Sequence, residues 1–411
     1  MTLCLFEDAT VARLAPLALT RAAFDLRIGA RTLWEGAEAA FAPEAAAVHT
    51  REAVRGVTLE EHPHAVPLAE VRGPVLLVNG RWRVRPGALV QSIRTAAAAG
   101  ETRAWVQGDD LLALALPEAP EAPSEFFQLP PGLTREEVSG ETVIGRLWHL
   151  VESVAERVAE DVTAMGGLGA REGAEVHPAA ALVAPEAIHL APGAEVAPGA
   201  VLDASAGPIH LASEASVGAN AVVAGPCWIG PGARVNAACR IGGSAVGERS
   251  KVGGEVHASV VHSFSNKGHD GYLGNSYLGR WCNLGADTNT SNLRNDYGEV
   301  SLWDPVERRD AKTGSQFVGL VMGDHSKCAI NTAFNTGTVV GVACNLFGAE
   351  FMPRHVPSFS WGGAARRVEY RPAKALRVAE AVMARRDRAL TDAGREALLA
   401  AHEATAPDRA A

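Results

Sequence analysis

Apolar residues in the second half of the chain recur every six positions. Small residues keep the same period and follow four places later. The apolar series is Val217, Val223, Ile229, Val235 and Ile241, and the small series is Ala221, Cys227, Ala233, Cys239 and Ala245. A period of six is typical of solenoids whose every coil is a triangle of three short parallel strands. The pattern therefore predicts a left-handed parallel β-helix over 171–365.

The six-residue spacing is not continuous over this range. It is lost around 247–270, returns with Tyr272, Leu278 and Leu284, and resumes from Met322 to Met352 after a long insert. Before residue 217 it is uneven, because Pro and Gly in 191–208 shift the phase. We therefore expect irregular or capping coils at the start of the β-helix.

The first third of the chain has a different pattern. Short apolar runs at 3–6, 45–49 and 75–78 predict buried strands, and helical spacing covers 24–41 and 87–99. Residues 105–116 predict a hairpin that turns at Gly108 and Asp109. Strands alternating with helices favour a small α/β domain with a parallel sheet over 1–120.

Two further segments connect and end these domains. Five prolines in 117–132 indicate a linker, and apolar residues at helical spacing in 143–165 predict a packing helix, so 121–170 forms a connecting part. Residues 366–411 are predicted to be helical, with one helix at 374–390 and a last helix capped by Thr391 or Asp392.

Composition narrows the functions. The formal charge is −9, from 38 basic and 47 acidic residues, without basic clusters interleaved with aromatics, so we expect no nucleic-acid partner. No long apolar stretch predicts a membrane span or a signal peptide, which favours a cytoplasmic protein. The six cysteines contain no C-x-x-C pair. We expect them to be small buried residues that form neither disulfides nor a metal site.

One motif in the β-helix carries a family resemblance. Lys267-Gly-His269-x-x-Tyr272-Leu-Gly274 precedes Asn283-Leu-Gly-Ala286-Asp-Thr288. This order resembles the acetyltransferase domain of the bifunctional N-acetylglucosamine-1-phosphate uridyltransferase/glucosamine-1-phosphate acetyltransferase family. A divergent, sugar-nucleotidyltransferase-like branch is similar over most of the chain, through the segments 265–281 and 357–363 and the opening 16–21. The resemblance implies acetyl-CoA as co-substrate, an amino-sugar phosphate as acceptor and a homotrimer.

The chemistry of such a transfer requires an unprotonated sugar amine. A neutral imidazole is suited to take the proton, which makes His269 the candidate base. The resemblance implies that Glu255 orients this ring, and that Tyr272 and Asn283 position the substrate. It also assigns Ala286 and Trp281 to the acetyl-CoA side, with a backbone N–H near Ala286 for the oxyanion.

The sugar phosphate requires cationic or multidentate donors. Nearby candidates are His257, which stands where the family has a lysine, together with Lys267, Arg294, Arg240 and Asn292. Arg294 and Asn292 lie in the insert 290–316, whose length suggests a lid or a subunit-bridging loop.

The nucleotidyltransferase motif is altered in the first domain. The turn at 5–14 lacks the glycines that hold a triphosphate, and Asn79 stands where a Mg²⁺-binding aspartate is expected. Arg21, Arg27, Asn79, Arg81 and Asp109 are candidates for a nucleotide or anion site, with Mg²⁺ required only if this domain is active. We expect a retained scaffold with altered or lost nucleotide chemistry.

Three other functions remain open from the sequence. The first is a sugar-1-phosphate nucleotidylyltransferase that forms UDP-N-acetylglucosamine. The second is a zinc hydratase of the β-helix type, suggested by the spacing of His257 and His262. The third is a non-catalytic scaffold.

Overall fold

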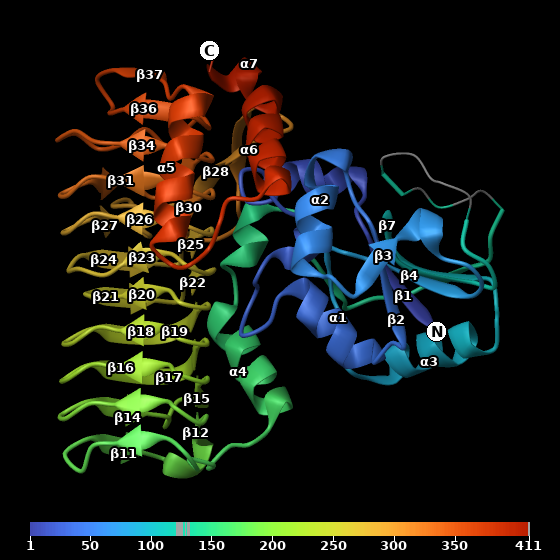
Figure 1. The fold of residues 1–411 in the computed structure, drawn as a ribbon, viewed down its shortest axis with the longest axis horizontal. Coiled ribbons are helices and arrows are strands. Elements are labelled where there is room, and N and C mark those ends of the chain that lie inside the picture. The colour runs from blue at the N-terminus through green and yellow to red at the C-terminus, as the bar shows by residue number, and fades with distance from the viewer. Residues whose placement is uncertain (121–125, 128, 130–131, 410–411) are drawn as a thin grey trace. The chain divides into compact units, whose positions relative to one another are not determined.

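The computed structural model describes residues 1–120, 126, 127, 129 and 132–409 (Figure 1). The chain forms two compact units. The first comprises residues 1–26, 31–146 and 391–400, and the second comprises 27–30, 147–390 and 401–411. The four-part division expected from the sequence stays a prediction, and part of the proline-rich stretch lies outside the described residues.

The first unit is built on a seven-stranded sheet with the order β3-β2-β1-β4-β7-β6-β8. Its strands are β1 (Thr2–Phe6), β2 (Ala45–His49), β3 (Ala65–Pro67), β4 (Val75–Asn79), β6 (Arg103–Gln107), β7 (Asp110–Leu116) and β8 (Arg135–Glu137). β1 to β4 are parallel, whereas β7 pairs antiparallel with β4 and with β6. The predicted parallel sheet and the hairpin at Gly108 are thus confirmed, and the hairpin makes the sheet mixed.

Helices connect the parallel strands of this unit. They are α1 (Leu33–Phe41), α2 (Glu52–Glu61) and α3 (Ala88–Ala98), and a small ladder pairs β5 (Trp82–Arg83) with β9 (Thr142–Val143). The prediction that a helix starts at residue 24 is wrong. Thr32 caps α1 through its hydroxyl, which accepts from the Glu35 N–H, while the Glu35 carboxylate accepts from the Thr32 N–H. This capping box fixes the start of the helix at Leu33.

The second unit is a parallel β-helix with three faces, and the left-handed β-helix expected from the hexapeptide pattern is confirmed. Face A holds β10 (Glu175–Val176), β13 (Glu195–Val196), β16 (Ser216–Val217), β18 (Arg234–Val235), β20 (Lys251–Val252), β23 (Asn266–Lys267), β26 (Asn283–Leu284), β31 (Lys327–Cys328), β34 (Asn345–Leu346) and β36 (Ser360–Gly362), with β37 (Arg367–Glu369) antiparallel at its end. Face B holds β11 (Ala181–Val183), β14 (Val201–Asp203), the first parts of β17 (Val222–Ile229) and β19 (Arg240–Val246), β21 (Glu255–His257), β24 (Tyr272–Gly274), β27 (Asn289–Thr290) and β32 (Ala333–Phe334).

Face C completes each coil. It holds β12 (Ile188–Leu190), β15 (Ile209–Leu211), the ends of β17 and β19, β22 (Val260–Val261), β25 (Tyr277–Leu278), β30 (Val321–Met322), β33 (Val339–Val340) and β35 (His355–Val356). We call the turns between successive faces the AB, BC and CA corners.

The stack is continuous where the sequence suggested interruptions. β20 pairs in register with β23 within 247–270. β10, β13 and β16 already pair as regular coils before residue 217. The six-residue count fails because two corners are shorter there: Val252 and Val256 flank an AB corner and are four apart, and Val256 and Val261 flank a BC corner and are five apart. Leu273 and Leu278, five apart, are the buried residues, so the prediction that Tyr272 points inward is wrong.

The interior of the β-helix is one apolar cluster that runs from the first coils to Val356. The six cysteines are free and buried, as predicted. Burial raises the pKa of the Cys227, Cys239 and Cys282 thiols to about 12, which keeps them protonated and unreactive at neutral pH.

Helices and an insert lie on the outside of the β-helix. α4 (Val154–Met165) packs on β17 and β19, and the predicted helix 143–165 is shorter because a 3-10 turn precedes it. The insert forms an antiparallel hairpin of β28 (Ser301–Asp304) and β29 (Arg309–Lys312), anchored where the Trp303 ring stacks on His355 at 4.1 Å between centroids. Its role as a lid or subunit bridge stays a prediction.

The last helices are α5 (Pro372–Ala384), α6 (Asp392–Ala404) and α7 (Ala406–Arg409). α5 ends six residues before the predicted limit of 390, and Thr391 caps α6 by accepting from the Gly394 N–H. None of the described helices is both long and apolar enough to cross a membrane.

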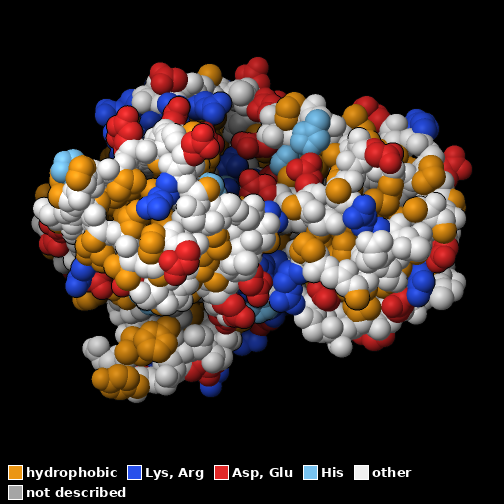
Figure 2. Space-filling model, turned by 90° about the horizontal axis from the view of Figure 1, so that it is seen from below, with side chains coloured by type: hydrophobic (Ala, Val, Ile, Leu, Met, Phe, Trp, Pro, Cys, Tyr) orange, Lys and Arg blue, Asp and Glu red, His pale blue; other side chains and the backbone are white. Residues whose placement is uncertain are grey.

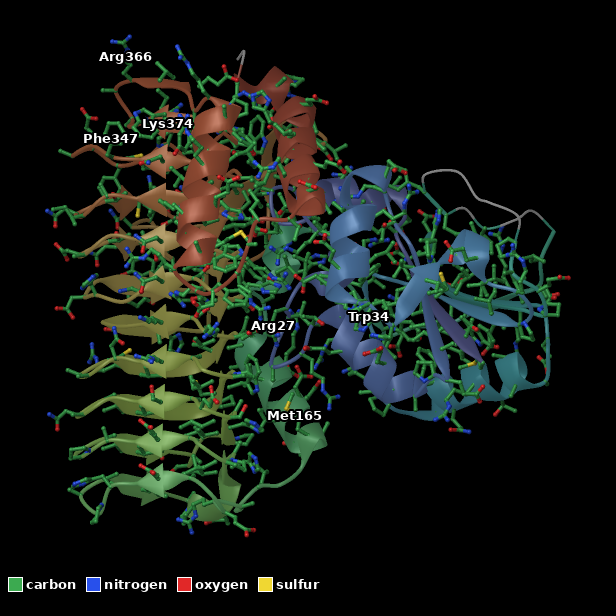
Figure 3. The ribbon with its side chains drawn as sticks, in the orientation of Figure 1. Arg27, Trp34, Met165, Phe347, Arg366 and Lys374 are labelled. Atoms are coloured by element: carbon green, nitrogen blue, oxygen red, sulfur yellow. The ribbon has the colours of Figure 1, made fainter. Side chains whose placement is uncertain are left out.

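Segment 27–30 packs with the second unit. The Arg27 N–H donates to the Tyr277 hydroxyl at 3.0 Å, and its guanidinium lies 4.5 Å from the centroid of the Trp228 ring (Figure 3).

Candidate active site on the β-helix

Face B gathers several of the predicted site residues. Arg240, Glu255 and Tyr272 occupy equivalent positions on three successive coils, so their side chains form one outward column. His257 follows two residues after Glu255 on the same strand and is exposed. The sequence did not show this grouping, because it depends on how the coils stack.

Tyr272 organises a polar network on this face. Its hydroxyl accepts from the Asn292 amide at 3.0 Å, and the same amide donates to Asn275 at 2.8 Å. Burial and the Glu255 charge raise the pKa of the Tyr272 phenol, so it stays protonated at neutral pH. Its ring lies against Gly274, where a Cβ would be only 2.2 Å from the hydroxyl oxygen.

Glu255 does not have the partner expected for it. Its carboxylate accepts from the Arg240 guanidinium on the preceding coil, and both side chains are partly exposed. No hydrogen bond joins Glu255 to His269 among the described residues. The role of Glu255 in orienting the imidazole therefore stays a prediction, which would require the carboxylate to exchange Arg240 for His269.

His269 lies exposed at the AB corner that leads into Tyr272. Its backbone is held from inside the β-helix: the Lys267 ammonium donates to the carbonyl oxygens of His269 at 2.7 Å and of Gly253 at 2.9 Å. Asn236 adds a hydrogen bond at 2.8 Å to the carbonyl of Gly268. The side chain is thus free toward solvent while its main chain is fixed.

Lys267 is not the phosphate ligand that the sequence suggested. It is paired with Val252 in register and points inward, with only 2% of its surface exposed. Desolvation lowers the pKa of its ammonium, although nearby acidic groups oppose this. A buried ammonium without hydrogen-bond acceptors would be costly, so the two carbonyl oxygens that accept from it account for its position.

Three other candidates lie on different sides of the solenoid. Asn283 projects from face A and accepts from the Asn266 amide at 2.8 Å. Trp281 is buried at the CA corner and stacks on Phe264 at 4.4 Å, so it is a structural residue and not a cofactor contact. Ala286 lies at the AB corner one coil after His269, where Asp287 N–H donates to the Asp270 carbonyl.

Arg294 is exposed but already paired. It forms a two-point ion pair with Asp296, with distances of 2.8 and 2.5 Å. The hydrogen bonds that Arg294 donates to Asp296 raise the pKa of Arg294 and lower the pKa of Asp296. Binding of a phosphate by Arg294 would therefore have to displace a carboxylate.

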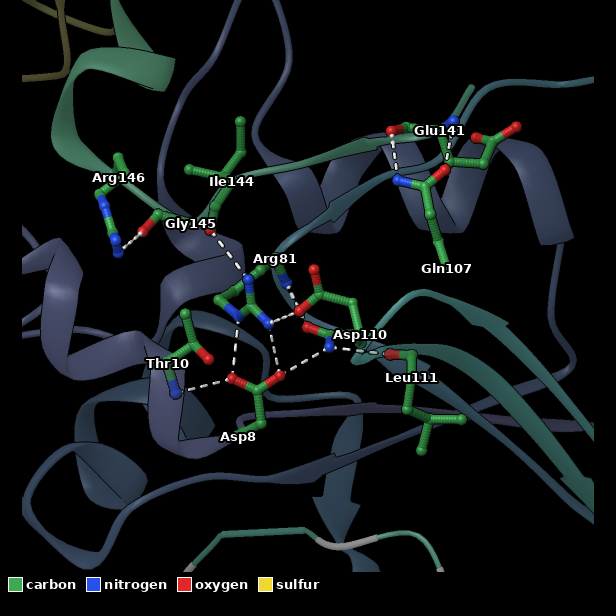
Figure 4. Close-up of polar contacts among 11 residues, drawn as sticks. Asp8, Thr10, Arg81, Gln107, Asp110, Leu111, Glu141, Ile144, Gly145 and Arg146 are labelled. Atoms are coloured by element: carbon green, nitrogen blue, oxygen red, sulfur yellow. Dashed lines mark hydrogen bonds and ion pairs between the residues drawn. The ribbon is translucent and has the colours of Figure 1, made fainter. Parts of the chain in front are cut away.

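In the first unit the turn after β1 is filled by an ion-pair network (Figure 4). Asp8 accepts from Arg81 at 2.9 and 2.6 Å, from the Asn79 amide at 2.8 Å and from the Thr10 N–H at 3.0 Å. Arg81 also donates to Asp110 at 2.5 Å and is almost fully buried. Arg81 and Asn79 therefore satisfy a carboxylate of the chain itself and do not line an anion pocket.

The other candidates in the first half of the chain are also separated. Arg21 is buried, and its carbonyl accepts from Arg51, which pairs with the buried Glu7 carboxylate at 3.0 Å. Arg27 belongs to the second unit, as described above. Asp109 lies at the hairpin turn and lines, with Asp8, a cavity of about 300 Å³ at the ends of β1 and β6. Glu7, Asp8 and Arg51 were not singled out from the sequence, since their pairing joins distant segments.

The residues present do not fit a bound metal. Among the described residues no three His, Cys, Asp or Glu side chains converge as ligands. The Asp8 carboxylate, which accepts from Asn79 at the position where a Mg²⁺-binding aspartate is expected, is neutralised by Arg81. His257 is exposed, whereas His262 is buried beside Ser263, so this pair gives no support to a zinc hydratase.

Comparisons with known proteins agree with this architecture. Residues 3–166, less than half of the chain, match the family model described as sugar nucleotidyl transferase. The bifunctional protein GlmU of Methanocaldococcus jannaschii is 32% identical over 104 residues, which cover 25% of each protein. A bifunctional sugar-1-phosphate nucleotidylyltransferase/acetyltransferase of Sulfurisphaera tokodaii is 30% identical over 111 residues, 26% of this chain and 27% of that protein.

The structural matches are weaker. LpxA, a UDP-N-acetylglucosamine acyltransferase from Bacteroides fragilis, has 13% identity and a TM-score of 0.25, over 49% of this chain and 73% of that one. Such a likeness carries no argument about function. The chain also spans only about a quarter of the length of the curated relatives named above.

The chain thus joins a segment that matches the sugar nucleotidyl transferase model to a β-helix. Over about a quarter of its length the chain is similar to GlmU-type bifunctional proteins, in agreement with the resemblance that its motifs carry.

Proposed function

We propose that the protein is an acetyl-CoA-dependent N-acetyltransferase that acts on an amino-sugar phosphate such as glucosamine-1-phosphate. The observation that carries the proposal is the exposed His269 imidazole on a main chain fixed by Lys267, next to the polar column on face B. An exposed base on a rigid support is the arrangement that proton removal from a bound amine requires.

The proposed reaction follows from the balance of protons and bonds. The sugar amine attacks the thioester carbonyl carbon, and His269 accepts the proton that the nitrogen loses as the C–N bond forms. The tetrahedral oxyanion then collapses and the C–S bond breaks, so that the thiolate leaves and is protonated from the imidazolium. The products are the N-acetyl sugar and free CoA.

Face B is the proposed sugar site. Tyr272 and Asn292 present a phenol and an amide already oriented by one another, and His257 supplies a ring nitrogen for the phosphate. Arg240 would reach a phosphate only by sharing or exchanging its contact with Glu255. We further propose a homotrimer that works in the cytoplasm.

We also propose that the first unit has lost or altered its nucleotidyl transfer chemistry. The Asp8–Arg81 network supports this, because a carboxylate and its partner fill the turn that would receive the triphosphate. The alternative, active nucleotidyl transfer, is favoured by the family match of residues 3–166.

A two-part activity screen tests both proposals. The first part measures thiol release from acetyl-CoA with amino-sugar phosphates, and the second measures pyrophosphate release from UTP, dTTP or GTP with Mg²⁺ and sugar-1-phosphates. Turnover only in the first part supports the proposed function. Turnover only in the second part overturns it in favour of the nucleotidylyltransferase.

Lys267 is proposed as a positioning residue, and its role gives a specific prediction. Lys267→Met keeps a flexible side chain in the core but removes both hydrogen bonds to the corner carbonyls. We expect kcat to fall roughly 10- to 100-fold with little change in KM for acetyl-CoA, because the imidazole is displaced and not lost.

The matched control is Lys327→Met. Lys327 also donates from face A to a corner carbonyl, that of His325 at 2.8 Å, but lies away from His269. Its replacement should leave kcat unchanged. Equal losses in both variants would show that Lys267 serves only stability.

A further inference from the structure

Five cations without acidic partners gather at the start of face A and at the end of α5. Arg234 and Lys251 occupy equivalent positions on adjacent coils, Arg249 precedes Lys251 at the CA corner, and Arg385 and Arg386 follow α5. We call this group the basic patch. Among the described residues none of the five is ion-paired. An ion pair beside the patch joins Glu248 to Arg388 at 3.6 Å.

The patch is held together by the backbone. Arg249 donates to the carbonyl of Arg386 at 3.0 Å, and Arg386 donates in return to the carbonyl of Arg249. These reciprocal hydrogen bonds keep two guanidinium groups close in spite of their repulsion. Burial is the largest cause that lowers the pKa of Lys251 and of Arg386, and the charges of the neighbouring arginines lower it further. Lys and Arg side chains gather at the upper left of Figure 2, which views the molecule from below.

A groove leads away from the patch. It has a volume of about 790 Å³, follows the face A strands of the first coils, and reaches Arg234 and Asn236 at one end. Its other end carries Glu175 and Glu195. The charge along the groove therefore favours an anionic group at the patch and disfavours it at the far end. Asn236 also bonds the Gly268 carbonyl, which joins this end of the groove to the His269 corner.

From this geometry we infer that the basic patch binds a ligand with two or more linked phosphate groups, and that the rest of the ligand extends along face A toward the His269 corner. Cations spread over two coils and a helix end match several phosphates better than one. Such phosphates belong either to the adenine nucleotide part of an acyl-CoA or to a free nucleotide. The direction of the ligand toward His269 rests on the proposed function, whereas the binding of phosphates by the basic patch does not.

Calorimetric titration tests the patch directly, with inorganic pyrophosphate, CoA and UDP as separate probes. In the variant Arg234→Glu/Lys251→Glu we expect the affinity for the bound probe to fall at least 10-fold. Binding to the unchanged protein should weaken with added salt, since exposed charges are screened. Tighter binding of CoA identifies the acyl donor as the source of the phosphates, and tighter binding of UDP identifies a nucleotide.

The control is Arg366→Glu/Arg377→Glu, which makes the same change in net charge with two exposed arginines elsewhere in the second unit. It should bind as the unchanged protein does. Equal affinity in both double variants, or no binding of any probe, would overturn the inference. Because pyrophosphate binding needs no turnover, an inactive protein that still binds it would contradict the proposed function and leave the patch intact.

Discussion

Replacing His269 with alanine should lower kcat for acetyl transfer by about 10²- to 10⁴-fold, the range expected when a general base is removed. The ring is exposed and its main chain is fixed by Lys267 through the His269 carbonyl, which the substitution leaves in place. The melting temperature should therefore stay unchanged. Thiol release from acetyl-CoA at saturating amino-sugar phosphate measures the effect.

The control for this prediction is His64→Ala, which removes an exposed histidine of the first unit that pairs with Glu38 at 2.9 Å and lies edge-on to Trp34. Its turnover should equal that of the unchanged protein. If His269→Ala also keeps full turnover, the imidazole takes no part in the reaction and the proposed mechanism fails.

Arg81→Met should destabilise the first unit by about 2 to 3 kcal/mol, less than the cost of breaking a fully buried ion pair, because the Asp8 and Asp110 carboxylates keep part of their solvent exposure. Arg81 is 1% exposed, and its loss leaves the Asp8 and Asp110 carboxylates without their cation. Hydrogen exchange in peptides from β1 and β4 would report this loss locally. The double variant Asp8→Asn/Arg81→Met should recover part of it, since the uncompensated charge is removed.

The matched control is Arg103→Met, which breaks an exposed pair with Glu136 and should cost less than about 1 kcal/mol. A similar loss in both arginine variants would contradict the special role of Arg81.

The same network predicts how stability depends on pH. Burial raises the pKa of Asp8, but hydrogen bonds and charge from Arg81 outweigh this and hold it below its ordinary value. The contribution of Asp8 is therefore complete above the unfolded pKa of about 3.9 and is lost as pH falls through the lower folded pKa. The stability difference between the unchanged protein and Arg81→Met should shrink in this acidic range. A difference that is constant with pH would mean that Asp8 titrates alike in both proteins.

The sequence was sufficient for the β-helix because its core repeats. Every coil contributes one inward residue per face, so many positions support one interpretation. The six-residue spacing gave the wrong orientation for individual residues where a corner of the β-helix contains fewer residues. There Leu273 points inward in place of Tyr272, since a shift of one residue along a strand reverses the side that a side chain faces.

The candidate site could be predicted only in part for the same reason. His269 is recognisable because it stands in a motif that interrupts the repeat, and the structure keeps it exposed. Lys267 and Trp281 belong to the same motif, yet their sides and partners are set by neighbouring coils. Contacts such as Asp8 with Arg81, 73 residues apart, leave no local pattern that a sequence reading could use.

The division of the chain between its units has a consequence for synthesis on the ribosome. Residues 391–400 belong to the first unit, where Thr391 donates to Glu60 at 2.8 Å and Gly56 leaves room for Ala393. The nascent first unit must therefore wait, with α2 uncovered, until residues 391–400 have emerged. We expect this helix to be the portion most exposed to chaperones and proteases while translation is under way.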